Sequence, residues 1–538
     1  MPFRQTILFL IATLGLFLTT GCSPRETRVS VGDRTQTIHI GNGSEPSDLD
    51  PQLITTITDA QIVMGLMEGL TAMDPQTAHP TPAVAKSWDS SADQRIWTFH
   101  LRADARWSNG GAVTARDFVY AYQRILSPNL ASEYAYMLFC LAGAESYNNG
   151  QLKNFSQVGV HATDDHTLVL LLQNPVPYLP ALVMHQAWFP VHRGTIEKFG
   201  KMDQRGTLWT RPGNYVGNGA FTLAAWEPHQ VIRLVKNPAY WNQAAVRAHE
   251  IDFYPIEDRA TEEAAFRSGQ LHITAGLPVD KIATYQRDQP KLLRQESTFA
   301  TTYILFNTTK PPLDDARIRR ALTLVIDRKA LTERVLKGGR IPAYNLTPPG
   351  IAGYDAGTYL KEDVNEARRL LAEAGFPNGT GFPHLELMAS KGGNSLFSEA
   401  IQQMWLTQLG LNISIVNQEG RVFSDSVHNH QYDLASYGWV GDYLDPSTFL
   451  ELMTRESGNN NTGWSSPAYD RLIAEARATG DNSRRYALYR EAERILIDEM
   501  PLAPLCFMRR NYLCQPSVKG WYGNPLDLHP LKSVYLEP

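Results

Sequence analysis

The 538-residue chain has few cysteines, no excess of charge of one sign, and no long apolar run beyond its N-terminus. Four cysteines are too few for a disulfide-stapled scaffold. The chain has 50 Lys and Arg against 55 Asp and Glu, with no basic stripe, so no nucleic-acid partner is expected. After the N-terminus no stretch approaches about 18 consecutive apolar residues, so we expect the remaining chain to be soluble.

Sequence signatures of catalysis are also missing. The chain has no Gly-x-Ser-x-Gly, His-Glu-x-x-His, Walker or Cys-x-x-Cys motif. Residues 41–43 (Gly-Asn-Gly) lack the third glycine of a dinucleotide site, and residues 428–430 (His-Asn-His) have no metal-ligand frame around them. We therefore predict no catalytic residues, no metal ligands and no cofactor, and we expect a binding protein instead of an enzyme.

The N-terminus carries an export signal. Arg4 precedes the apolar run 7–18, whose 12 residues are too few for a bilayer span, which needs about 20. Thr19-Thr20-Gly21-Cys22 follows. A positive start, a short apolar run and small residues predict a signal peptide over residues 1–21.

Cys22, directly after Gly21, resembles the cysteine of the bacterial lipoprotein lipobox. That resemblance implies lipid attachment at Cys22, followed by a polar, unpatterned tether over residues 22–37. The leucine usual three positions before the cysteine is replaced by Thr19. An ordinary cleaved signal and a free exported protein is therefore the alternative.

The mature chain is too long for one domain, because single hydrophobic cores stop growing at about 250–300 residues. Period-2 patterns predict strands at 37–40, 97–101, 219–235 (a pair) and 411–415. Thr114 and Asp117 resemble a capping box opening a helix over 115–126. Further helices are predicted at 314–335, 365–374, 398–409, 469–478 and 483–499. The alternation of helix and strand predicts an α/β domain.

Three cysteines remain after Cys22. Cys506 and Cys514 are the closest pair in sequence, and in an exported protein they could form a disulfide or remain free. Cys140 lies in an apolar stretch and is expected to be a small buried residue.

Segments along most of the mature chain resemble the oligopeptide-binding proteins, the substrate-binding components of peptide ABC importers. The matching stretches, in order, are 45–51, 65–70, 83–88, 97–110, 113–124, 218–221, 237–241, 317–322 and 438–447. The resemblance implies an α/β, periplasmic-binding-protein-like two-lobed fold with an additional accessory domain, three domains in all. Lobe 1 (domain I) would comprise 30–67, 194–300 and 507–538, the accessory domain II 68–193, and lobe 2 (domain III) 301–506. The change of character near residue 313 agrees with this division.

The same resemblance implies a site that grips what all peptides share, their backbone and charged ends. One strand edge in each lobe would pair with the ligand's main chain. The residues implied for these edges are Thr55, Thr56 and Ile57 in lobe 1, and Gly438, Trp439 and Val440 in lobe 2. Gly438 and Gly441 would let another backbone approach closely.

Asp442 would pair with the α-ammonium group of the peptide, although its sequence context also suits a turn or cap residue near Asp445. Trp439 and Tyr134 are expected to form walls of the side-chain pockets. For the carboxylate end, the positions where some relatives carry basic residues correspond to Val427 and Ser436, both uncharged. Asn394, Lys391 and His428 are the nearby polar candidates.

These residues predict a monomeric, membrane-anchored lipoprotein of the periplasm or cell envelope. Its expected partners are short peptides, the permease of an ABC transporter and, through the lipid, the membrane. Within the same fold, the alternatives are a murein peptide, a metal chelate or another amphiphile as ligand. An exported hydrolase and a structural lipoprotein are the remaining alternatives.

Overall fold

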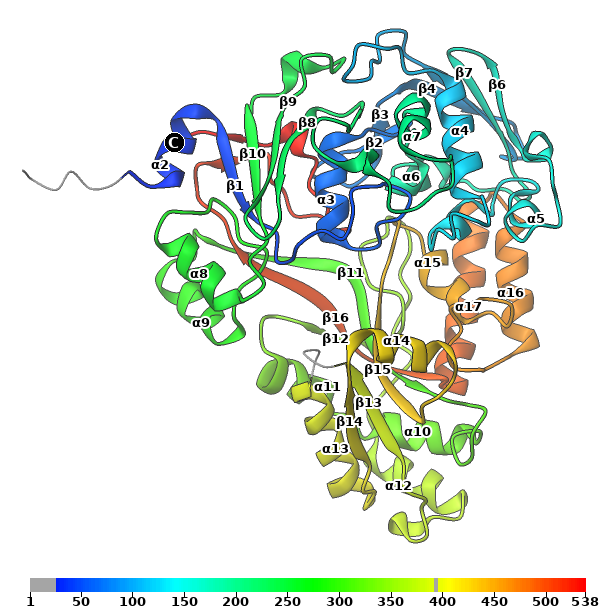
Figure 1. The fold of residues 1–538 in the computed structure, drawn as a ribbon. Coiled ribbons are helices and arrows are strands. Elements are labelled where there is room, and N and C mark those ends of the chain that lie inside the picture. The colour runs from blue at the N-terminus through cyan, green and yellow to red at the C-terminus, as the bar shows by residue number, and fades with distance from the viewer. Residues whose placement is uncertain (1–25, 391–394) are drawn as a thin grey trace, which may run out of the picture.

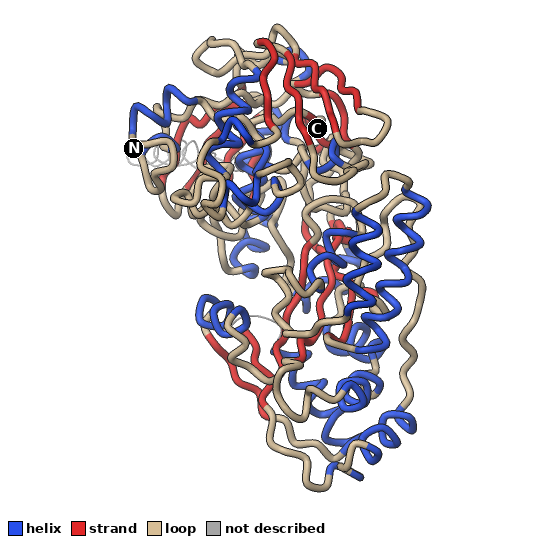
Figure 2. Tube along the Cα trace, turned by 90° about the vertical axis from the view of Figure 1, so that its right-hand side faces the viewer, coloured by secondary structure: helices blue, strands red, loops and turns tan. Residues whose placement is uncertain are grey.

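The computed structural model describes residues 26–390 and 395–538, so Cys22, Lys391 and Asn394 lie outside the described residues. An upper body contains the N- and C-terminal parts of the chain, and a lower body contains most of the second half (Figure 1). The view turned by 90° separates the same two bodies (Figure 2). Within the described residues no helix is both long and apolar enough to cross a membrane.

A four-stranded sheet of order β1-β10-β9-β8 forms part of the upper body. Its strands are β1 (Thr37–Gly41), β8 (Phe221–Glu227), β9 (Val231–Lys236) and β10 (Glu250–Tyr254). β1 pairs in parallel with β10, more than 200 residues later in the chain. The upper body also contains α3 (Ile57–Leu66), α7 (Arg193–Phe199), α8 (Arg259–Arg267), α9 (Val279–Asp288) and the small pair β17 (Val518–Lys519) and β18 (Tyr535–Leu536).

The segment expected to be an unstructured tether contains a helix, α2 (Arg28–Thr35). Thr27 caps it, because its side chain accepts a hydrogen bond from the backbone N–H of Ser30 at 3.1 Å. Val29 N–H also donates to the carbonyl of Gly269. The prediction for residues 28–35 was wrong: local capping and a contact with a distant loop fold this polar stretch against the upper body.

A second four-stranded sheet, of order β4-β5-β7-β6, lies beside the first in the upper body. Its elements are β4 (Ala85–Ser90), β5 (Ile96–Leu101), β6 (Val160–Asp164), β7 (Thr167–Leu171) and the covering helix α4 (Ala115–Ile125). The predicted capping box at Thr114 and Asp117 is confirmed. The connecting elements are β2 (Thr71–Met73), β3 (Pro80–Pro82), α5 (Ala144–Asn148) and α6 (Leu179–Leu182).

These two sheets share one hydrophobic core. A single cluster of buried side chains runs from Ile38 and Phe253 of the first sheet to Phe99 and Leu168 of the second. The buried Arg124 of α4 adds a polar link, because it donates to Asp50 and Gln52, which precede α3. The accessory sheet is therefore fixed to the first sheet, and the upper body is expected to move as one unit.

The lower body is built on a six-stranded mixed sheet of order β12-β16-β11-β15-β13-β14. The strands are β11 (Leu293–Phe306), β12 (Ile341–Pro342), β13 (Glu386–Ser390), β14 (Ser414–Gln418), β15 (Leu434–Val440) and β16 (Leu502–Leu513). The accompanying helices are α10 (Ala316–Leu324), α11 (Arg328–Ala330), α12 (Val364–Glu373), α13 (Ser395–Leu409), α14 (Gly420–His428), α15 (Ser447–Leu450), α16 (Pro467–Arg477) and α17 (Asn482–Glu499).

Most sequence-based elements of this body are confirmed, with two corrections. The helix predicted over 314–335 is interrupted after Leu324, because Asp327 caps a new helical turn by accepting from the N–H of Ala330 at 2.8 Å. The strand predicted at 411–415 begins only at Ser414, since Leu411 and Ile413 are buried in the helical core instead.

The long strands β11 and β16 run from one body into the other and pair along most of their length (Figure 1). Their register shifts between Ser297 and Thr301 and again between Thr302 and Tyr303. Such irregularities bend and twist a strand pair locally. This crossing is therefore where a change of angle between the two bodies is expected to be absorbed.

The suggested Cys506–Cys514 disulfide is absent, and Cys140, Cys506 and Cys514 are free thiols. Cys506 lies within β16 and Cys514 directly follows it. Eight residues of extended strand span about 26 Å, whereas bridged cysteines have Cα atoms at most about 6.8 Å apart. Proximity in sequence was misleading because the segment is one straight strand.

Candidate functional site

One edge of β15 is unpaired where the sequence predicted peptide binding. Along one side, β15 pairs with β11 from Leu434 to Val440. On the other side, β13 reaches only Leu434 and Ala435, and no described residue pairs with the rest of that edge. Gly438 is exposed and Val440 is 39% exposed. The segment 438–440 therefore offers backbone N–H and C=O groups to an incoming extended chain.

Asp442 follows this edge by two residues and is partly buried. The hydroxyl of Tyr136 donates to its Oδ2 at 2.9 Å, and its own backbone N–H donates to Oγ1 of Thr448 at 3.2 Å. Burial raises the pKa of Asp442 to about 6, an effect that the hydroxyls of Tyr136 and Tyr134 partly offset. The carboxylate is thus held in place but incompletely stabilised.

No cationic side chain within the described residues forms an ion pair with Asp442. Its neighbour Asp445 is different: buried like Arg485, it accepts a hydrogen bond from that guanidinium at 2.7 Å. His185, near Tyr134, remains neutral because burial lowers its pKa to about 3. A buried carboxylate is stable when it is paired, so Asp442 is arranged to accept a cation from a ligand.

The residues around Asp442 come from both bodies. Tyr134 and Tyr136 have ring centroids 6.0 Å apart; Tyr134 is the N-cap of a short 3-10 helix (Ala135–Leu138) in the upper body, and Tyr136 lies within it. Tyr178 of the same body stacks on Tyr443 with centroids 5.3 Å apart. Tyr134, expected from the sequence to be a pocket wall, lies beside Asp442 together with Tyr136, which was not predicted; the Tyr-Ala-Tyr pattern two residues on was the available signal.

The strand edge predicted at Thr55, Thr56 and Ile57 is wrong as secondary structure. Thr55 lies in irregular backbone, and Thr56 lies in a bend and is the N-cap of α3, accepting from the N–H of Asp59 at 3.1 Å. Ile57 is the first residue of that helix. A Thr side chain three residues before an Asp is a strong helix start. Thr55 and Thr56 are exposed, so their backbone groups can still contact a ligand, but neither residue belongs to a strand.

A cavity of about 350 Å³ lies between the two bodies and has Ile57 on one wall and Val440 on another. It is large enough for a small ligand or part of a peptide.

The two glycines expected to admit a ligand backbone, Gly438 and Gly441, differ in their surroundings. A Cβ on Gly441 would lie 2.3 Å from the Phe299 ring, so that glycine serves internal packing and not the approach of a ligand.

The lining of this cavity is basic, which sequence analysis did not anticipate. Five of its side chains are cationic, namely those of Arg259, Lys337, Arg340, Arg509 and Arg510. They come from three separate parts of the chain, so no single local pattern predicted the cluster. The positions predicted from the sequence contribute less: Val427 is buried and His428 is exposed at the end of α14.

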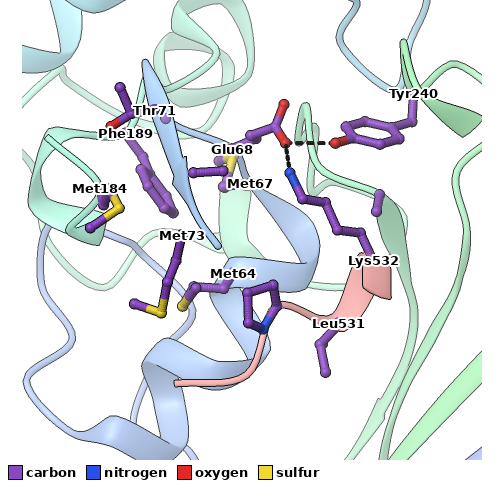
Figure 3. A pocket seen from close by; sticks show the side chains of 14 residues that line it. Met64, Met67, Glu68, Thr71, Met73, Met184, Phe189, Tyr240, Leu531 and Lys532 are labelled. Carbon is purple, nitrogen blue, oxygen red and sulfur yellow. Dashed lines mark hydrogen bonds and ion pairs between the residues drawn. The ribbon is translucent and has the colours of Figure 1, made fainter. Parts of the chain in front are cut away.

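A second cavity lies inside the upper body, between α3, the accessory domain and the C-terminal segment (Figure 3). Its volume is about 30 Å³, room for only about two waters. Methionines line it, and Glu68 accepts hydrogen bonds from Tyr240 at 2.6 Å and Lys532 at 2.8 Å (Figure 3). It is too small for a peptide, so the interbody cavity is the candidate ligand site.

A model of the family described as "Bacterial extracellular solute-binding proteins, family 5 Middle" matches residues 79–461. The chain belongs to this family, a class of extracytoplasmic, non-enzymatic transport components. The expectation that it is not an enzyme agrees with that membership.

Individual members of the family show which proteins this chain is similar to. The chain is 36% identical over 511 residues to "Periplasmic oligopeptide-binding protein OppA" of Escherichia coli K12, covering 93% of this chain and 92% of that protein. It is 33% identical over 502 residues to "Periplasmic murein peptide-binding protein MppA" of the same organism, covering 91% of each. The fold is similar to Haemophilus influenzae OppA in complex with RPPGFSPFR, with a TM-score of 0.81, 32% identity, and coverage of 93% and 99%. The predicted three-domain, two-lobed α/β fold is confirmed.

Proposed function

We propose that this protein captures short peptides outside the cytoplasm and delivers them to an ABC permease for import. The observation that carries the proposal is Asp442, a positioned carboxylate without a cationic partner among the described residues, beside the unpaired edge of β15. A peptide supplies both missing partners, an ammonium group and a backbone. The relatives named for oligopeptides and murein peptides support the same class of ligand.

Binding would couple to closure of the two bodies. The β15 edge belongs to the lower body, whereas Thr55 and Thr56 belong to the upper one, so an extended peptide can contact both only when they approach. Contacts made only in the closed state shift the equilibrium toward it. Both contacts would involve the peptide backbone and not its side chains, so peptides of varied sequence would bind.

We further propose the domain limits expected from the sequence: 30–67, 194–300 and 507–538, then 68–193, then 301–506. The limits near 300 and 507 fall inside β11 and β16, the strands that cross between the bodies, which supports them. A cleaved signal over residues 1–21, lipid attachment at Cys22 and a monomeric state also remain proposals. Intact-mass measurement of the membrane-extracted protein tests the lipid directly.

The proposed function is tested with a matched pair of peptides, one free and one acetylated at its N-terminus. Acetylation removes the ammonium and leaves Asp442 unpaired in a desolvated site, a loss that typically costs about 2–5 kcal/mol. We expect affinity in calorimetry to fall at least about 30-fold. A peptide amidated at its C-terminus is the control for a general loss of charge. Equal affinities for free and acetylated peptides would exclude the ammonium site.

Peptide affinity is expected to depend on pH in a defined window. Asp442 must be ionised to bind the ammonium, and its pKa in the ligand-free protein is about 6. Affinity should therefore fall as pH drops below 6, and fall again above about 8, where peptide amino groups lose their proton. Binding at pH 5.5 should release a proton, visible as a buffer-dependent enthalpy.

The variant Tyr136→Phe tests whether Asp442 is the group that titrates. It removes a hydrogen bond that lowers the pKa of Asp442, so the acid limb of the profile should move to higher pH. An unchanged acid limb in this variant would mean that another group titrates.

A further candidate ligand is a peptide with additional carboxylates, such as a murein peptide. The basic lining of the interbody cavity and the similarity to MppA favour it. Mass spectrometry of ligand released from the purified native protein separates ordinary oligopeptides from murein peptides and from non-peptide ligands.

A further inference from the structure

Three side chains that take no part in the proposed ammonium and backbone contacts converge beside the interbody cavity. They are Glu296 of β11, and Asp527 and His529 of the C-terminal segment, each with one ligand atom within 4.8 Å of the others. Asp527 and His529 also line the interbody cavity. Because Glu296 lies more than 200 positions before the other two in sequence, no spacing motif reveals the set.

The backbone, the ring face and the Nδ1 atom of His529 are all held by neighbouring groups. The side-chain amide of Gln61 accepts from its backbone N–H at 2.8 Å and donates to its carbonyl at 2.6 Å. The ring stacks on Trp521 with centroids 4.0 Å apart, and Nδ1 lies 2.9 Å from the carbonyl oxygen of Tyr522. A carbonyl only accepts, so Nδ1 carries the proton and Nε2 of the neutral ring is a lone-pair donor.

Within residues 26–390 and 395–538, that Nε2 atom has no hydrogen-bond partner, although the His529 side chain is only 1% exposed. Its nearest charged neighbour is Oδ1 of Asp527, at 3.5 Å. This separation is too long for a good hydrogen bond. It fits two ligands of one tetrahedral ion, which lie about 3.3 Å apart when metal–ligand bonds are about 2.0–2.1 Å.

Glu296 presents a second buried atom without a partner. The hydroxyl of Tyr512 donates to Oε1 at 2.6 Å, while Oε2 has no hydrogen bond. Tyr512 in turn accepts from the indole N–H of Trp521 at 3.1 Å, so the carboxylate is oriented by a network that includes the indole stacked on His529. Buried polar atoms are rarely left unpaired, and here two belong to residues of one cluster.

Asp527 completes the set. Its backbone has φ of 55°, an unfavourable conformation for a residue with a Cβ. Arg510 donates to Oδ1 and supplies one positive charge, but a carboxylate accepts several partners. The cluster thus holds two carboxylates and one guanidinium, and this excess of acidic groups favours a cation.

We propose that Glu296, Asp527 and His529 form a binding site for a divalent transition-metal ion, with Zn²⁺ as the best match. Zn²⁺ binds imidazole nitrogen as well as carboxylate oxygen, whereas Mg²⁺ and Ca²⁺ take oxygen ligands. One imidazole and two carboxylates therefore suit Zn²⁺ better. The His529 Nδ1–carbonyl contact is the outer support typical of metal-bound histidines. Three protein ligands leave a fourth position toward the interbody cavity.

The test uses full-length protein freed of peptide and stripped of metal with a chelator. Zn²⁺ is titrated in calorimetry, and Co²⁺ is added as a spectroscopic probe. We expect one ion per chain, a micromolar or tighter Kd, visible-region absorption typical of tetrahedral Co²⁺, and a higher thermal midpoint with Zn²⁺. Lack of binding even at millimolar metal would overturn the proposal and assign a proton to Nε2.

Two variants locate the ion. His529→Phe retains an aromatic ring against Trp521 but removes the ligand, and Glu296→Gln retains the acceptor for Tyr512. Each should weaken Zn²⁺ at least about 100-fold, since even outer-shell changes cost 10–100-fold. His100→Ala is the matched control, because His100 forms an exposed pair with Asp89 at 2.8 Å and should bind as the wild type does. Undiminished binding in Glu296→Gln, which changes only one oxygen to NH₂, would contradict the site.

Discussion

Replacing Asp442 by asparagine is expected to remove tight peptide binding and at the same time stabilise the ligand-free protein. The two effects share one cause, the partly buried carboxylate that lacks a cation among the described residues. Losing its charge leaves the peptide ammonium desolvated and unpaired, which costs about 2–5 kcal/mol, or about 30- to 5,000-fold in Kd.

The sign of the stability change follows from linkage. The pKa of Asp442 is raised from 3.8 to about 6 in the folded protein, so the folded state holds its proton more tightly than the unfolded chain does. That contribution to stability is fully present below pH 4 and is lost as the pH rises through 6. At pH 7, Asp442→Asn should therefore raise the free energy of unfolding by about 1–3 kcal/mol.

The measurement combines calorimetry with peptide and thermal unfolding without it, at pH 7 and at pH 4. Asp425→Asn is the control, because Asp425 is an exposed acid on α14 of the same body. Weaker binding together with lower stability would indicate general damage to the fold. Retained affinity would show that Asp442 does not contact the peptide.

The largest expected loss of stability comes from Arg124→Met. Arg124 is fully buried, its guanidinium donates to Asp50, to Gln52 at 2.6 Å and to the carbonyl of Met202 at 2.7 Å. Removal of one partner leaves Asp50, itself 2% exposed, as a buried charge. Breaking such a pair typically lowers the free energy of unfolding by about 3–5 kcal/mol.

Urea denaturation followed by tryptophan fluorescence measures this loss. The control is Arg193→Met, whose pair with Glu197 is exposed and should contribute less than about 1 kcal/mol. The double variant Arg124→Met/Asp50→Leu removes both charges and should recover much of the stability, since no unpaired charge remains. A single variant as stable as the control would show that the buried pair does not join the two parts of the upper body.

Local signals predicted local structure well. The alternation at 97–101 became β5, and the Thr114/Asp117 box begins α4, because strand pleat and helix capping depend on residues close in sequence. Predictions from local sequence were wrong where one local feature is compatible with two different structures. Thr56 could belong to an extended edge, but its hydroxyl caps α3. Cys506 lies within β16 and Cys514 directly follows it, so the extended strand keeps them apart.

By itself the sequence determined the two-lobed α/β class, the absence of recognisable catalytic motifs and the choice of Asp442 and Gly438–Val440 as candidate binding residues. Only the tertiary structure decided that Asp445 has an arginine partner and that Asp442 has no cationic partner among the described residues. It also decided that Tyr136 holds Asp442, and that Glu296, Asp527 and His529 meet. The reason is physical: periodicity and capping act within a few residues, whereas burial, pairing and pKa depend on atoms that the chain brings together from hundreds of positions apart.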